Sequence, residues 1–232
     1  MTLYYQSIYY QLGWTTILYI IPCVFIAMVC HEYFKARTAK ALGCLVDENV
    51  YKNPLKFIPV FGYIFGVLSG YCWGKAQPAN VDRLSKGKKV LYYFSGSIAN
   101  IALAVIASVL QALVFVVMLY ASAELEGIWD DIHFAFNLFV WIQLFMAITQ
   151  ILPIPTFSGY AIIKTLFFQN VRNKTLDKIE SNGKWIFIVL VLLGLLYYVS
   201  ELPVGFAFEW LYAGMTKLVD LITGGLFTQA GW

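Results

Sequence analysis

Long uncharged segments are the feature that most restricts what this chain can fold into. Residues 12–30 carry no charged side chain, and neither do residues 90–123. About 20 consecutive apolar residues are enough for an α-helix to cross a bilayer. Only 12% of all residues are charged and 60% are hydrophobic, whereas a soluble domain has roughly 25% charged residues. The sequence therefore predicts an all-α polytopic membrane protein, and its small net charge of +3 gives no sign of nucleic-acid binding.

Three membrane-spanning helices should form the core. We expect the first to end near Gly43, a typical C-cap residue. The third should end where Pro153 and Pro155 stop a helix. The predicted core helices cover approximately residues 12–42, 90–120 and 134–152. In the second of these, Gly96, Asn100 and Ala104 share one face that allows close helix packing, with Asn100 interpreted as a buried helix–helix hydrogen bond.

The remaining apolar segments should surround this core. Residues 57–73 are short and rich in glycine, and both their flanks are basic, so we expect a re-entrant segment that is shielded by protein. Residues 185–200 are predicted to form an extra span. Residues 203–232 are predicted to form an interfacial helix, with a sixth span as the weaker alternative. The whole chain, 1–232, is then one membrane domain, with a core over 12–165 and a C-terminal transmembrane and interfacial segment over 166–232.

The distribution of Lys and Arg predicts the topology. Five such residues lie in each of three segments, and none lies in residues 1–34 or 90–163; the basic segments are residues 35–56, 74–89 and 164–184. Basic loops stay on the cytoplasmic side. We therefore expect the N-terminus and the acidic residues 124–131 outside, and both His31 and the turn at residues 152–159 at the cytoplasmic end of their helices. Contact with anionic lipid through these basic loops is a further expectation.

An incomplete metal motif ends the first uncharged segment. His31 and Glu32 are followed by Lys35. On a helix, positions 31 and 35 lie on one face, one turn apart. With histidine at both positions, this would be the zinc-protease pattern H-E-x-x-H. Lys35 either extends to the interface, as lysine commonly does, or forms an ion pair with Glu32.

Several segments together resemble the site-2 proteases, which are intramembrane zinc metalloproteases. Their family patterns are H-E-x-x-H-A…L-G, N-P-L-K, G-x-x-K-P-V-x-V-N, A-G-P-x-x-N and L-P-I-P-P-L-D-G. The corresponding segments here are H-E-Y-F-K-A at 31–36 with L-G at 42–43, N-P-L-K at 53–56, G-K-A-Q-P-A-N at 74–80, S-G-S-I-A-N at 95–100, and L-P-I-P-T-F-S-G at 152–159. The resemblance covers roughly residues 25–165 and implies the three-helix core of that family.

The departures from the family fall on the metal. The resemblance implies His31 as one zinc ligand and Glu32 as the general base, but it places Lys35 and Ser158 where the family has its second His and its Asp. A catalytic zinc needs three protein ligands plus water, and a protonated lysine has no lone pair to donate. We therefore expect a remnant pocket without zinc or any other cofactor, made of His31, Glu32, Lys35, Asn100, Ser158 and Gly159.

Three classes of function remain open from the sequence. The favoured one is a catalytically inactive homologue that acts as a structural or regulatory subunit and binds another membrane protein. The alternative is an active intramembrane metalloprotease with an atypical metal site, which Cys44 or Cys72 would have to complete. Cys30 points about 100° away from His31 around the helix, and His133 is expected near the outer end of its helix. A transporter or lipid-binding protein is the third class, but it would need a continuous polar path through the membrane.

Overall fold

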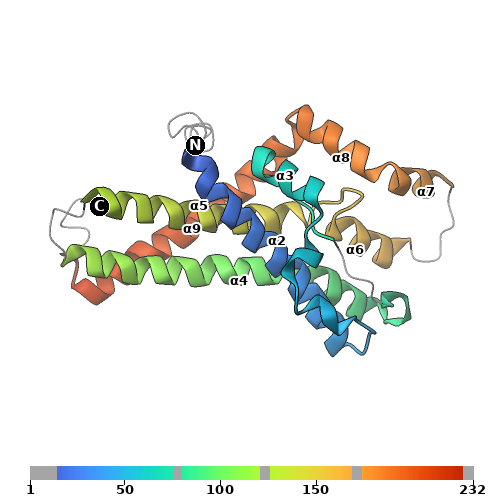
Figure 1. Cartoon of the computed structure of the whole chain (residues 1–232), viewed down its shortest axis with the longest axis horizontal. Coiled ribbons are helices and arrows are strands. Elements are labelled where there is room, and N and C mark those ends of the chain that lie inside the picture. The colour runs from blue at the N-terminus through green and yellow to red at the C-terminus, as the bar shows by residue number, and fades with distance from the viewer. Residues whose placement is uncertain (1–14, 76–79, 121–125, 169–173, 227–232) are drawn as a thin grey trace.

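Three long helices form the centre of the molecule. The computed structural model describes residues 15–75, 80–120, 126–168 and 174–226, and every regular element in those ranges is helical (Figure 1). The long central helices are α2 (Thr15–Ala41), α4 (Lys86–Leu119) and α5 (Glu126–Thr149). The third of these begins eight residues before the predicted start at 134, because its first turns include acidic residues, which the start of a helix favours. Each of the three helices has a segment long and apolar enough to cross a membrane. The predicted all-α polytopic membrane fold is therefore confirmed.

Small residues let α2 and α4 cross closely. Ala27 of α2 and Ala104 of α4 are completely buried. Asn100 donates a hydrogen bond from Nδ2 to the Ala27 carbonyl over 3.4 Å. Gly96, one turn earlier on α4, lies against the His31 ring. A larger residue at these positions would hold the backbones apart, so the crossing brings the second half of α2 onto α4.

The predicted re-entrant segment contains one short helix, α3 (Val60–Ser69). Ten residues of helix extend only about 15 Å, roughly half the thickness of the hydrocarbon layer. The chain reverses at Gly70, whose φ of 78° is left-handed, and the Lys75 N–H then donates to the Phe57 carbonyl over 2.8 Å. The segment therefore returns to the place where it began, as the basic flanks on both sides require. Short 3-10 helices lie around it: η1 (Glu48–Val50), η2 (Pro54–Phe57) and η3 (Val81–Arg83).

The last third of the chain differs from the prediction in its helix boundaries. It contains α6 (Ser158–Phe167), α7 (Lys174–Ser181), α8 (Gly183–Leu192) and α9 (Leu195–Thr223). The segment expected as one span over 185–200 is divided at Gly194, whose φ of 69° cannot continue a right-handed helix. α9 then runs through Pro203 and fills most of the segment expected as a separate interfacial helix. Packing against α4 and α5 explains why this helix continues despite its proline.

Aromatic side chains connect α8 to the re-entrant segment. Phe187 of α8 is 1% exposed. Its ring packs against those of Phe65, Trp73 and Phe157, at centroid distances of 5.7, 5.4 and 5.0 Å. Protein therefore covers the turn that follows α3, which a non-helical backbone at membrane depth needs.

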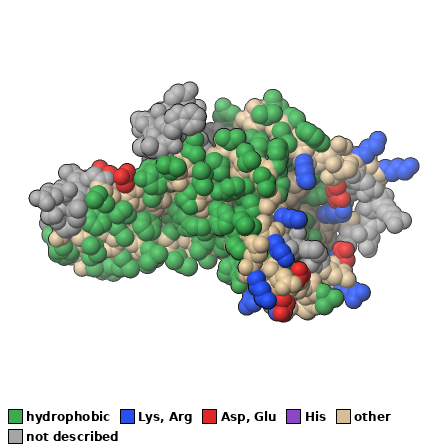
Figure 2. Space-filling view, viewed as in Figure 1, with side chains coloured by type: hydrophobic (Ala, Val, Ile, Leu, Met, Phe, Trp, Pro, Cys, Tyr) green, Lys and Arg blue, Asp and Glu red, His purple; other side chains and the backbone are tan. Residues whose placement is uncertain are grey.

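The basic side chains gather at one end of the molecule. In Figure 2, Lys and Arg cluster at the end where α7 and the short 3-10 helices lie, and the helical bundle beside them is almost entirely hydrophobic. The three basic segments therefore share one end, as the topology requires. Residues 76–79 of the loop motif and the last residues of the predicted 203–232 segment lie outside the described ranges.

Candidate functional site

The three motif residues lie in the second half of α2 and are all buried. His31 is 0%, Glu32 4% and Lys35 7% exposed. α2 continues past them to Ala41, so Lys35 is not at a helix end from which it could extend to the interface. The loop beyond is fixed to the helix, since Tyr51 donates its hydroxyl hydrogen to the Ala36 carbonyl over 3.1 Å. Burial raises the pKa of Tyr51, which keeps that donor protonated.

Lys35 forms an ion pair with Glu32. Its Nζ lies 3.3 Å from both carboxylate oxygens. The ammonium also lies 5.8 Å from the centre of the Tyr92 ring on α4, close enough for a cation–π contact. Lys35 therefore pairs with Glu32 and does not extend to the membrane interface. The positive charge therefore sits inside the protein, between a carboxylate and an aromatic ring.

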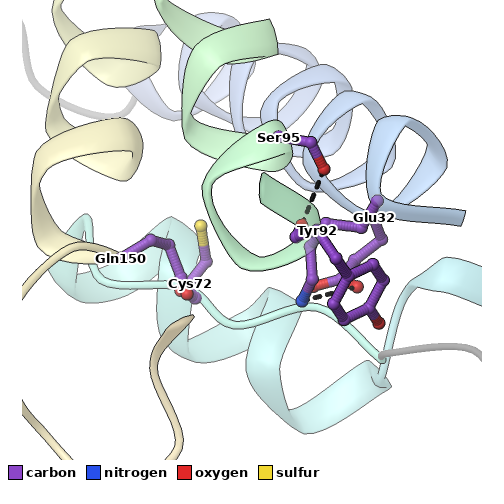
Figure 3. A network of polar contacts seen from close by, with 6 residues as sticks. Glu32, Cys72, Tyr92, Ser95 and Gln150 are labelled. Carbon is purple, nitrogen blue, oxygen red and sulfur yellow. Dashed lines mark hydrogen bonds and ion pairs between the residues drawn. The ribbon is translucent and has the colours of Figure 1, made fainter. Parts of the chain in front are cut away.

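Glycine and aromatic residues from two other segments enclose this pair. A Cβ added at Gly74, after α3, would come within 2.2 Å of Glu32 Cγ, so the loop backbone lies directly on that side chain. Figure 3 shows Glu32 beside Tyr92, and Ser95 donating to the Tyr92 carbonyl, over 2.7 Å. Neither Gly74 nor Tyr92 was assigned to the site from the sequence. Gly74 is nevertheless the first residue of the loop motif.

His31 stacks on the α4 backbone. A Cβ at Gly96 would lie 2.6–2.7 Å from three ring atoms, including Nε2. Nearly equal distances place that point over the face of the ring. Neither ring nitrogen of His31 has a hydrogen-bond partner within the described residues. Gly96 is therefore required here because any side chain would displace His31.

The segment expected to carry the third ligand is held against the re-entrant loop. The Gly159 N–H donates to the Gln150 carbonyl over 2.8 Å, and Gln150 Nε2 donates to the Cys72 carbonyl over 3.2 Å. Figure 3 shows the Gln150 side chain beside Cys72. A Cβ at Gly159 would come within 1.9 Å of the Ile151 carbonyl oxygen. This turn therefore needs glycine at position 159.

Ser158 is buried next to this turn. It is 5% exposed, and its Oγ has no hydrogen-bond partner among the described residues, so it bonds to neither Lys35 nor His31. Its helix, α6, packs on α4, the helix that also carries Tyr92 and Gly96. The convergence of Ser158 with Lys35 stays a prediction.

These residues do not fit a catalytic zinc. His31 supplies one imidazole, whereas Lys35 supplies a cation that is already paired with Glu32. In the described part of the chain, no three His, Cys, Asp or Glu side chains are grouped so that they could hold a metal ion. His133 makes its contacts elsewhere, with Gln111 at 3.1 Å and Asn137 at 2.8 Å. Among the described residues, His31 and Lys35 therefore do not supply the three donors around an open position that a zinc protease uses.

Comparison with known proteins finds a metalloprotease relative. The chain is 28% identical over 189 residues to the "Putative zinc metalloprotease YwhC" of Bacillus subtilis (strain 168), an alignment that covers 78% of this chain and 83% of the relative. No family model matches the chain, and no solved structure does. The fold and the comparison together describe an all-α membrane protein that is similar, over most of its length, to a bacterial protein named as a zinc metalloprotease.

Proposed function

We propose that this chain is a catalytically inactive homologue of intramembrane zinc metalloproteases, of the site-2 type, which acts as a structural or regulatory subunit and binds another membrane protein. The ion pair between Glu32 and Lys35 is the observation that carries this proposal. It places a fixed positive charge one helical turn from His31, in the position of the second histidine ligand.

The chemistry of the pair argues against zinc-dependent hydrolysis. In such an enzyme, a carboxylate beside the metal takes the proton of the zinc-bound water. Here both oxygens of Glu32 lie 3.3 Å from the Lys35 ammonium. A second cation beside this lysine would be repelled, and the carboxylate already has a positive partner in Lys35. Glu32 and Lys35 together therefore balance the charge of the site without a metal.

The name of the relative supports a second candidate, an active metalloprotease with an atypical metal site. This function needs at least two metal ligands besides His31. The two proposals differ in one measurable quantity, the zinc content of the protein.

Zinc content tests the proposal directly. The full chain is purified in detergent, equilibrated with zinc, desalted and analysed by elemental mass spectrometry, beside His31→Ala. We expect less than about 0.1 zinc per chain in both, because one good ligand is too few. Stoichiometric zinc that disappears in His31→Ala would refute catalytic inactivity and favour the metalloprotease.

A restored ligand set provides the matched control. The double variant Lys35→His/Ser158→Asp recreates the two histidines and the aspartate of the family pattern. We expect it to retain close to one zinc per chain, and the further change His31→Ala to remove that zinc. Failure of the double variant to bind zinc, while it remains folded, would show that Ser158 does not occupy the third ligand position.

A further inference from the structure

A large groove lies along α9, far from the motif residues in sequence. Its volume is about 890 Å³, and it lies between Trp141 of α5 and one face of α9 that runs from Tyr198 to Ala213. Most of its lining is apolar, but Glu209 and Glu201 also line it, two helical turns apart. We name this surface the α9 groove.

Contacts with neighbouring helices place the groove at membrane depth. Next to Glu209, the Phe208 ring packs on Trp141 with 5.5 Å between centroids. Trp141 lies eight residues before the end of α5 at Thr149, or about 12 Å along the helix axis. Further along α9, Met215 packs in one cluster with Ala112 and Phe115 of α4. α9 therefore runs beside the middle of α5 and the C-terminal half of α4, both of which are long enough to span the membrane. Glu209 lies between these two contacts, within the length of the two helices.

Glu209 is an unusual residue for such a surface. Its side chain is exposed, and no cation lies within ion-pair distance of it in the described part of the chain. Large apolar side chains surround it, with Leu202 79% and Phe206 70% exposed. An ionisable side chain at membrane depth is costly and normally has a partner. Glu209 therefore requires a partner that the chain itself does not supply in its described residues.

We propose that the α9 groove docks a transmembrane helix of a different membrane protein, with a Lys or Arg of that helix opposite Glu209. The apolar walls fit a helix surface, and Gly205 and Ala213 in the lining let its backbone approach. The positive charge pairs with Glu209 away from water. This inference rests on the part of the proposed function that makes the chain a binding subunit, and it is independent of whether zinc binds.

Charge also decides between this occupant and the others. Two copies of the chain in one membrane are related by an axis along the membrane normal, so α9 would meet α9 in parallel, with Glu209 facing Glu209. A second copy would therefore bring like charges together. A lipid acyl chain would fill the apolar part of the groove but leave the carboxylate unpaired.

A model transmembrane peptide tests the charge pairing. The purified full chain is placed in phosphatidylcholine vesicles with a labelled polyleucine helix that carries one central Lys, or Leu at the same position, and binding is measured by energy transfer. We expect the Lys peptide to bind about tenfold more tightly than the Leu peptide. Glu209→Gln should abolish that preference, and Glu209→Lys should transfer it to a peptide with a central Glu. The control Asp131→Asn removes an exposed carboxylate outside the groove and should retain the preference.

Two matched glycine substitutions test the groove itself. A Cβ at Gly205, in the lining, meets no atom within 4 Å, and the same holds for Gly214 on the same helix, which is not part of the lining. We expect Gly205→Leu to weaken binding of the Lys peptide at least about tenfold with unchanged thermal unfolding, and Gly214→Leu to leave binding unchanged.

Several results would overturn the inference. Equal binding of the Lys and Leu peptides to the unmodified chain would assign the groove to lipid. Energy transfer between labelled copies of the chain that Gly205→Leu abolishes would assign it to a second copy. Retention of the Lys preference in Glu209→Gln or Gly205→Leu would place the binding site elsewhere. The zinc content of the same preparation separately tests the proposed inactivity, so the two proposals fail independently.

Discussion

At the scale of single residues, the candidate site is defined by a charge that stays inside the protein. Lys35 has a flexible stem that often carries its ammonium to water. Here α2 continues beyond Lys35, and the Lys35 Nζ contacts Glu32 and the Tyr92 ring instead of water. Burial of either charge alone would be strongly unfavourable. The two residues therefore depend on each other, and this dependence can be measured.

A double-mutant cycle measures the coupling between Lys35 and Glu32. Lys35→Met leaves a buried carboxylate without a partner, so it should destabilise the protein by about 3–5 kcal/mol. The double variant Lys35→Met/Glu32→Gln removes both charges and should be more stable than Lys35→Met alone. The measurement is reversible unfolding of the detergent-solubilised protein. If the two single effects add within about 0.5 kcal/mol, the residues are independent, and the charge compensation does not exist.

At the scale of elements, the sequence predicts a helix correctly where a long segment is apolar and uninterrupted by charged residues. The uncharged segments predicted α2 and α4 to within a few residues, and the basic flanks predicted the return of the chain around α3. α9 was not predicted as one helix because Pro203 and several charged residues interrupt its apolar pattern. Only its packing against α4 and α5, which a local pattern does not contain, shows that it continues.

In the candidate site too, a local sequence pattern predicts some residues, and only tertiary packing brings in the others. His31, Glu32 and Lys35 are neighbours on one helix, so their spacing sufficed to place them together. Gly74 and Tyr92 come from other segments, and only the tertiary structure brings them to Glu32 and Lys35. Ser158 follows a turn whose path depends on the backbone hydrogen bond from the Gly159 N–H to the Gln150 carbonyl, which no sequence spacing reveals.

The hydrogen bond from Gln150 to the Cys72 carbonyl connects α5 to the re-entrant segment, and its loss should loosen that segment. In Gln150→Leu, a buried acceptor loses its donor, which costs about 1–3 kcal/mol. Local opening should then be about 5- to 150-fold more frequent. Cys72 is 2% exposed, so its rate of modification by a maleimide, in a Cys23→Ala/Cys30→Ser/Cys44→Ser background that leaves it as the one cysteine, reports this opening.

Gln143, on α5 about two turns before Gln150, provides a matched control. It is also completely buried, but neither its Nε2 nor its Oε1 has a hydrogen-bond partner within the described residues. Gln143→Leu therefore removes an amide of the same size without breaking such a bond, and it should leave the reactivity of Cys72 unchanged or lower it. Equal acceleration by the two variants would mean that the bond from Gln150 does not hold the segment.

At the scale of the whole molecule, charge and length together define two ends. α4 has 34 residues, so it extends for about 51 Å, well beyond a hydrocarbon layer about 30 Å thick. Lys86, Lys88 and Lys89 lie at its first end, where the other basic side chains also gather (Figure 2). Its second end leads, through residues 121–125, to the start of α5 with Asp130 and Asp131. The molecule is therefore electrically asymmetric along the direction in which its helices span.

This asymmetry predicts the orientation of the chain, because basic segments remain on the cytoplasmic side. Cys44 lies in the loop after α2, at the basic end, and is partly exposed, whereas Asp131 is exposed at the other end. A membrane-impermeant maleimide should therefore label Asp131→Cys, in a Cys44→Ser background, in intact cells. It should label Cys44 in the otherwise unmodified chain only after the membrane is permeabilised. The variant Cys44→Ser alone is the control for labelling of the other cysteines, and it should stay unlabelled in intact cells. The reverse pattern would place the candidate site at the outer surface, and labelling of both positions from one side would contradict the membrane-spanning arrangement of α4.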